Sequence, residues 1–143
     1  MNDDQRLNYK YFSRITTRWM DNDIYGHINN VVYYSYFDSV TNKYLIEEGG
    51  LDIQNADIIG FVVASTCQYK SPVSYPEPLT AGLRVNKLGN SSVEYGIGIF
   101  KEGAEQASAM GTFTHVFVDR TTDKSVPIPS ELRVALEALV IQE

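Results

Sequence analysis

The sequence predicts an α+β fold in which an antiparallel sheet of five strands curls around one long central helix, with a short helix near the C-terminus. One segment with helical periodicity, residues 30–48, lies among five segments with strand character. Glycine-containing turns at Gly89-Asn90 and Glu102-Gly103 separate the last three of these strands by short distances, which is typical of antiparallel neighbours. With 43% apolar residues, the chain of 143 residues has enough material for one sizeable core, and we expect a single domain over residues 1–143.

The strand segments are rich in β-branched and aromatic residues that alternate with polar ones. They cover residues 9–19, 58–70, 79–88, 92–100 and 106–119. A proline-punctuated turn, residues 71–78, lies between the second and the third strand. Two further prolines precede an amphipathic segment, residues 130–140, which predicts a short helix with Ser130 as its cap.

The long helix is predicted from apolar side chains that recur every three or four residues. These are Tyr33, Tyr36, Phe37, Val40 and Tyr44. Asn29 or Asn30 can cap the start of the helix by accepting hydrogen bonds from free backbone N–H groups. Gly49-Gly50 supplies the flexible backbone that ends it.

Charge and cysteine content narrow the classes of partner and compartment. The net charge of −6 argues against nucleic acid as a partner, because phosphate binding relies on clustered Lys and Arg. No apolar run approaches the roughly 18 to 20 residues that cross a bilayer, so we expect no membrane association. The single cysteine, Cys67, forms no internal disulfide, and the acidic N-terminus is unlike a signal peptide, so a cytoplasmic protein is expected.

Polar residues concentrate in the segment RWMDNDIYGHINN, residues 18–30, immediately before the long helix. Asp21 and Asp23 are already ionised at neutral pH, and they lie a few residues from His27. Asp, Asn and Gly also dominate ordinary solvated turns, so this composition alone leaves both readings open. A metal site is not expected, because no third strong ligand lies nearby in the sequence.

Residues 19–38, WMDNDIYGHINNVVYYSYFD, resemble the hotdog-fold acyl-CoA thioesterases of the 4-hydroxybenzoyl-CoA thioesterase type. Weaker similarity covers nearly the whole chain, including residues 69–85 and 115–129. The resemblance implies a hotdog fold and a hydrolase that converts an acyl-CoA thioester to free acid and coenzyme A. It also implies a homodimer or homotetramer, and no cofactor beyond the coenzyme A of the substrate.

The same resemblance implies roles for particular residues. Asp23 matches the catalytic carboxylate of the family, which acts either as nucleophile or as general base. A backbone N–H at about Asn30, at the positive end of the helix dipole, matches the group that polarises the thioester carbonyl. His27 makes the sequence similar to the branch with Gly-His-x-Asn-Asn, related to plant acyl-carrier-protein thioesterases, in which the histidine assists catalysis. A role for His27 in ordering the turn remains the alternative.

Candidate substrate-binding residues are Gly26, Asn29 and Tyr33, with Tyr33 one helical turn from the expected carbonyl site. His115 and Cys67 lie within strands, where a core histidine and a buried thiol are the commoner outcomes, so we leave them out of the site. Five basic residues are candidates for contacts with coenzyme A phosphates: Lys70, Arg84, Lys87, Arg120 and Lys124.

Two other functions are compatible with the predicted fold. The first is hydration or dehydration of an acyl thioester, although hotdog lyases carry an Asn-Pro pair before the histidine that is absent near His27. The second is a non-catalytic module that binds acyl-CoA. The sequence leaves the acyl group open among aryl, short-chain and long-chain types.

Overall fold

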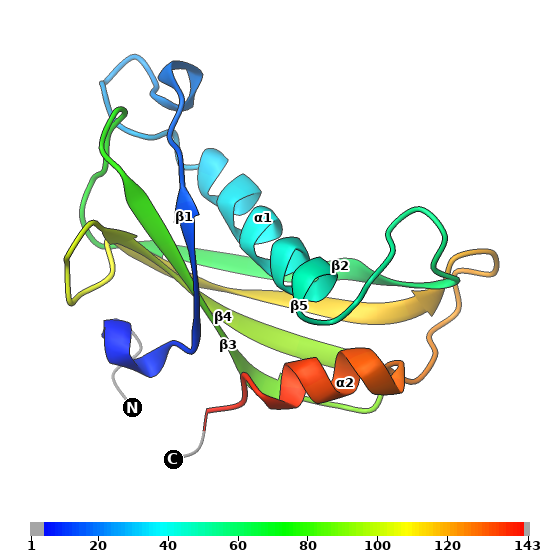
Figure 1. Ribbon diagram of the computed structural model, residues 1–143. Coiled ribbons are helices and arrows are strands. Elements are labelled where there is room, and N and C mark those ends of the chain that lie inside the picture. The colour runs from blue at the N-terminus through cyan, green and yellow to red at the C-terminus, as the bar shows by residue number, and fades with distance from the viewer. Residues whose placement is uncertain (1–4, 142–143) are drawn as a thin grey trace.

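A computed structural model describes residues 5–141, in which five antiparallel strands form one sheet with the order β1-β3-β4-β5-β2 (Figure 1). The strands are β1 (Tyr11–Ile15), β2 (Ile58–Tyr69), β3 (Leu79–Leu88), β4 (Ser92–Lys101) and β5 (Ala109–Asp119). β3, β4 and β5 are neighbours in sequence and in space, as the short turns predict. β1 and β2 form the two edges, because each pairs with one described strand, β1 with β3 and β2 with β5.

The long helix, α1 (Val32–Glu47), lies across one face of the sheet (Figure 1). Asn29 holds the entry to the helix, since its side-chain oxygen accepts from the Val31 N–H at 3.1 Å. At the other end, Gly50 takes a φ of +70°, a left-handed conformation that suits glycine and turns the chain out of the helix. The predicted glycine termination is confirmed. The predicted asparagine cap is wrong, because the cap position belongs to Val31, where no side chain bonds the free N–H groups of the helix, and Asn29 bonds the N–H of Val31 itself.

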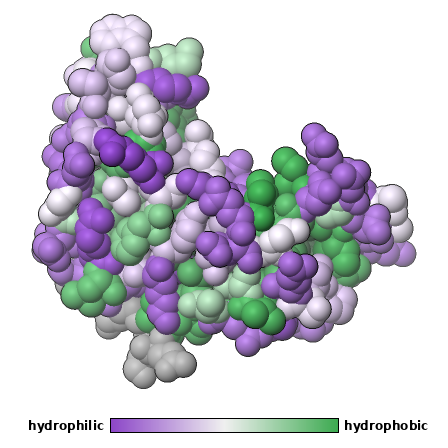
Figure 2. Space-filling model, in the orientation of Figure 1, coloured by the Kyte–Doolittle hydropathy of each residue, from purple (hydrophilic) through white to green (hydrophobic). Residues whose placement is uncertain are grey.

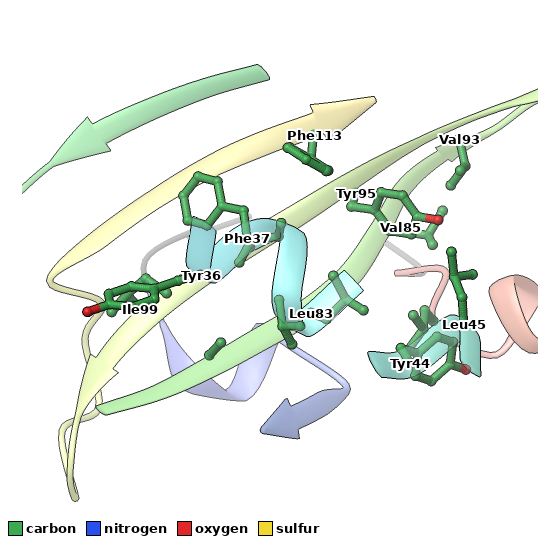
Figure 3. Close-up of a cluster of buried hydrophobic side chains, with 14 of the residues drawn as sticks. Tyr36, Phe37, Tyr44, Leu45, Leu83, Val85, Val93, Tyr95, Ile99 and Phe113 are labelled. Atoms are coloured by element: carbon green, nitrogen blue, oxygen red, sulfur yellow. The ribbon is translucent and has the colours of Figure 1, made fainter. Parts of the chain in front are cut away.

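The core lies between α1 and the sheet. Seven side chains of α1 are buried: Tyr33, Tyr36, Phe37, Val40, Thr41, Tyr44 and Leu45. Figure 3 shows four of them, Tyr36, Phe37, Tyr44 and Leu45, among side chains of β3, β4 and β5. All five residues that the sequence pattern assigned to the inner side of the helix are therefore in the core. The Tyr44 hydroxyl also donates to the carbonyl of Ala135 at 2.5 Å, which ties α1 to the C-terminal helix.

Some predicted boundaries are wrong. The first strand covers Tyr11–Ile15 rather than residues 9–19, because the chain turns into short 3-10 helices on either side, η1 (Arg6–Asn8) and η2 (Trp19–Asp21). The last strand starts at Ala109.

The last helix, α2 (Ser130–Glu137), also departs from its prediction. It ends three residues before the predicted end, and Ser130 is its first helical residue rather than its cap. The cap position belongs to Pro129, whose extended backbone (ψ 143°) already sets the start of the helix, and no side chain bonds the free N–H groups there.

Phe37 provides a test of the core. It is fully buried, and its ring lies so close to β5 that a Cβ added at Gly111 would be 2.8 Å from it. We expect Phe37→Ala to lower the free energy of unfolding by about 3–5 kcal/mol, because it leaves a cavity at the centre of the helix–sheet contact. Chemical denaturation measures the loss. The control Ser39→Ala, at an exposed position of the same helix, should change stability by less than about 0.5 kcal/mol.

Candidate active site

The acidic segment folds into a tight hairpin before α1. The backbone N–H of Asp23 donates to the carbonyl of His27 at 2.8 Å, and the N–H of Gly26 donates back to the carbonyl of Asp23 at 3.0 Å. Gly26 has a φ of +84°, which closes the turn in a conformation that other residues rarely adopt. The hairpin presents Asp23 half-buried at its base, and one carboxylate oxygen accepts from the Tyr25 N–H at 2.9 Å.

Asp21 anchors this hairpin to the helix. Its carboxylate is 1% exposed and accepts from the Tyr36 hydroxyl of α1 at 2.8 Å and from the Arg18 backbone N–H at 2.9 Å. The Arg18 guanidinium pairs with it at 2.9 Å. The Asp21 carbonyl in turn accepts from the Asn29 N–H at 2.9 Å, so one residue joins η2, the hairpin and the entry to α1.

The protonation of Asp21 follows from these contacts. Burial alone raises the pKa of the carboxyl, but hydrogen bonds from Tyr36 and Arg18, together with the charge of Arg18, outweigh it and hold the pKa below its ordinary value. Burial and the bond to the Asp21 carboxylate raise the pKa of the Tyr36 hydroxyl. Asp21 is thus ionised at neutral pH, and its carboxylate oxygens accept hydrogen bonds from Tyr36 and Arg18. These contacts suit a role in anchoring the hairpin.

The Asn30 amide is available at the entry to α1. The Val31 and Val32 N–H groups donate to Asn29, whereas the Asn30 N–H has no hydrogen-bond acceptor within residues 5–141. The Asn30 carbonyl accepts from the Tyr69 hydroxyl at 3.0 Å, which fixes the peptide next to it. The Asn30 amide, at the positive end of α1, can therefore donate to a bound ligand.

A cavity of about 290 Å³ opens between the hairpin, the start of α1 and the end of β2. Its lining residues are His27, Ile28, Tyr33, Tyr69, Lys70, Ser71 and Pro72. The structure thus brings His27 and Tyr33 together. Asp23, Gly26, Asn29 and Asn30 do not line this cavity in the single chain, but they belong to the hairpin and the helix entry that form its rim.

Sequence reasoning missed Tyr69. Its ring packs edge-on against Tyr33 with centroids 5.1 Å apart, while its hydroxyl holds the Asn30 carbonyl. It also missed Asn22, whose side chain accepts from the Tyr75 N–H at 2.9 Å and so fixes the hairpin against the loop between β2 and β3. Both contacts join residues about 40 to 50 positions apart, so no local pattern in the sequence predicts them.

The residues left out of the site lie elsewhere. His115 is buried with the Tyr95 hydroxyl 3.4 Å from its Nδ1, and burial lowers the pKa of its imidazole to about 4. It is a neutral core histidine, as expected. Among the five basic candidates, Lys70 borders the cavity, and Arg84 is buried on the other face of the sheet. The other three, Lys87, Arg120 and Lys124, do not line the cavity.

Comparison with known proteins identifies the family. A model of the thioesterase-like superfamily matches residues 17–136. The long-chain acyl-CoA thioesterase FadM of Escherichia coli is 28% identical over 131 residues, which cover 90% of this chain and 98% of FadM. The uncharacterized protein YsmA of Bacillus subtilis is 25% identical over 88 residues, which cover 62% of this chain and 59% of YsmA.

Among solved structures, the PA5185 protein of Pseudomonas aeruginosa is 54% identical and superimposes with a TM-score of 0.95, with 96% of each chain covered. The chain belongs to the thioesterase-like superfamily, a family of thioester hydrolases with the hotdog fold. The fold class and the family implied by the residues around Asp23 are both confirmed.

Two kinds of feature are absent from the described residues. Over residues 5–141, no three His, Cys, Asp or Glu side chains gather as a set of metal ligands. Neither described helix has the length and apolar character needed to cross a membrane.

The anchoring role of Asp21 predicts a pH-dependent stability. Asp21→Asn should lower the free energy of unfolding at pH 7 by about 1–3 kcal/mol, because it weakens the charge-assisted bonds from Arg18 and Tyr36. Since the folded state holds the pKa of Asp21 below the unfolded value near 3.9, the contribution is complete above about pH 4 and is lost as the pH falls through the folded pKa.

Urea unfolding of both proteins between pH 3 and pH 7 measures this difference. The gap between wild type and Asp21→Asn should narrow below about pH 4, while Asp38→Asn, at an exposed position of α1, should show no comparable gap. A gap that widens in acid would contradict the assignment.

Proposed function

We propose that the protein hydrolyses acyl-CoA thioesters to a free acid and coenzyme A, with Asp23 as the catalytic carboxylate. The observation that carries the proposal is the pairing of an ionisable side chain with an available amide. Asp23 stands at the base of the hairpin and the free Asn30 N–H stands at the entry to α1, with the cavity of His27 and Tyr33 beside them. Membership of the thioesterase-like superfamily and the match to FadM support the same reaction.

The chemistry follows from these two groups. An amide at a helix N-terminus stabilises the negative charge that develops on the carbonyl oxygen when a nucleophile adds to the thioester. Asp23 either adds directly or removes a proton from the attacking water. Both routes break the carbon–sulfur bond and add one water across it, and the departing thiolate takes a proton. Neither route requires a cofactor or a metal ion.

Other residues of the hairpin have supporting roles in this proposal. His27 borders the cavity at an exposed position, where it can contact the substrate or its leaving sulfur. Tyr33 and Tyr69 form an aromatic wall for the acyl group. Gly26 and Asn29 shape the backbone of the site. Gly26 closes the turn, and Asn29 accepts from the Val31 N–H through its side chain and from the Val32 N–H through its carbonyl, which orders the peptides on both sides of Asn30.

Substitution of Asp23 tests the reaction. Purified protein is assayed with aryl, short-chain and long-chain acyl-CoAs and a thiol reagent that detects released coenzyme A. We expect turnover of at least one class, and a loss of about 10²–10⁴-fold in kcat for Asp23→Asn, because the amide can neither attack nor accept the proton. Asp38→Asn, which removes an exposed carboxylate of α1, is the matched control and should retain wild-type turnover.

Three outcomes would contradict the proposal. Wild-type protein that turns over none of the acyl-CoAs but binds one tightly would be a binding module. Addition of water to an unsaturated acyl-CoA without thiol release would indicate a hydratase. Unchanged hydrolysis in Asp23→Asn would move the chemistry to another residue.

We further propose a homodimer that joins two sheets along β2. This edge strand is 12 residues long, carries no charged residue, and leaves Phe61 and Val63 exposed by 59% and 52%. A long, uncharged apolar edge is a template for another strand, and soluble proteins cover such edges. A second copy that pairs with β2 about a two-fold axis covers both edges at once. Because Tyr69 ends the same strand, the partner would also border the cavity.

A charge placed on this edge tests the dimer. Val63→Lys should convert the dimer to monomer in sedimentation experiments, because the lysine must be desolvated for the edges to pair. Val134→Lys, at a position of α2 that is 70% exposed, introduces the same charge elsewhere and should leave the dimer intact. A dimer that survives Val63→Lys but not Val134→Lys would place the interface on α2.

A further inference from the structure

A second cavity lies on the other side of α1, between this helix and the edge strand β1. Its volume is about 350 Å³, larger than the cavity beside His27. Ile15 and Val40 give it an apolar floor, and Tyr36 and Asp21, which share a hydrogen bond, also line it. We call it the β1–α1 groove. Figure 2 shows that the visible face of the molecule is also hollowed between the lobe of the acidic hairpin and the loop after α1.

The walls of the groove are polar and cationic. Arg14, Arg18 and Lys43 line it, against one carboxylate, Asp21, whose charge Arg18 already balances. The lining therefore carries an excess of positive charge, whereas the whole chain carries a net charge of −6. Positive charge gathered in one cavity of an acidic protein favours an anionic ligand at that place.

The helix face in the groove has a regular pattern. Ser35, Ser39 and Lys43 follow one another at intervals of four residues, so they form a single stripe that faces β1. A helix that packs directly against a strand fills the contact with apolar side chains. Here the stripe consists of small hydroxyl residues with a lysine at the far end, and the Lys43 ammonium reaches across to the Ser13 hydroxyl at 3.3 Å. The stripe keeps the groove open and supplies hydrogen-bonding groups along it.

We propose that the β1–α1 groove binds the phosphate-bearing end of the substrate's coenzyme A. The inference rests on the proposed acyl-CoA hydrolysis for the identity of the ligand. The pantetheine arm of coenzyme A combines methyl groups with amides, which suits an apolar floor between hydroxyl walls. Its phosphates suit Lys43 and Arg14, since cations bind phosphate oxygens through charge-assisted hydrogen bonds.

The spacing along α1 agrees with this direction. Asp21, which lines the groove, is two residues from Asp23, so the two backbones are at most about 7 Å apart. Lys43 is seven residues beyond Tyr36, which is about 10 Å farther along the helix. Lys43 therefore stands well away from the expected position of the reacting carbonyl, whereas Asp21 lies close to Asp23.

Binding of adenosine 3′,5′-bisphosphate tests the groove without any turnover, because this probe has the 3′-phosphate and the first 5′-phosphate of coenzyme A and no thioester. Calorimetry should show that the double variant Arg14→Ala/Lys43→Ala binds it about tenfold more weakly than wild type does. The matched control Lys10→Ala/Lys101→Ala removes two charges outside the groove and should change binding by less than about twofold. Equal losses in both double variants, or no binding to wild type, would overturn the proposal.

Inorganic phosphate separates the two sources of this chemistry. It should bind at least tenfold more weakly than the bisphosphate if the groove holds coenzyme A, and equal affinities would assign the groove to free phosphate instead. Ser39→Phe keeps the charges but fills the groove, and it should also weaken bisphosphate binding by about tenfold. Bisphosphate binding that is unchanged in Ser39→Phe would place the site elsewhere.

Kinetics distinguish this inference from the proposed function. Arg14→Ala/Lys43→Ala should lower kcat/KM for an acyl-CoA about tenfold more than for the matching N-acetylcysteamine thioester, which lacks the phosphates. Equal losses of kcat/KM for the two thioesters would contradict coenzyme A binding in the groove and would leave the proposed hydrolysis unaffected. No hydrolysis of either ester, together with bisphosphate binding that depends on Lys43, would overturn the hydrolase and leave the groove standing.

Discussion

The buried carboxylate of Asp21 is the contact on which the candidate site depends. It accepts from Tyr36 on α1 and from Arg18 before η2, and its carbonyl holds Asn29 at the entry to the helix. Because an unpartnered buried charge is costly, this residue restricts the hairpin to arrangements in which all these bonds form. Asp21, whose carboxylate is fully hydrogen-bonded within the protein, thus sets the position of Asp23 relative to the Asn30 amide.

The helix and the turn were predictable because their signals are local. Tyr33, Phe37 and Val40 repeat at helical intervals, and Gly50 marks a backbone that leaves the helix. The pairing of β1 with β3 and of β2 with β5 was not predictable in this way, since each joins strands far apart in the sequence. Strand ends and the supposed Ser130 cap failed for a related reason, because local preference yielded to the path that the surrounding chain imposes.

The same division applies to the site. The residue types around Asp23 pointed to thioester chemistry through their resemblance to a family, and the family is confirmed. Tyr69 and Asn22 escaped notice because their roles come from contacts across the fold. α1 separates two cavities. The cavity with Tyr33 lies on its β2 side, and the groove with Ser39 lies on its β1 side. In the proposals above, the acyl group and the coenzyme A end of one substrate occupy opposite sides of one helix, with the hairpin between them.

A crystal structure with an unreactive acyl-CoA analogue, in which a ketone replaces the thioester, tests the central claim most directly. The account predicts that the ketone oxygen lies about 2.7–3.1 Å from the Asn30 nitrogen, with a carboxylate oxygen of Asp23 about 3–3.5 Å from the carbonyl carbon or from a water placed to attack it. An analogue bound with its carbonyl remote from the Asn30 amide, and with Asp23 turned to solvent, would contradict it.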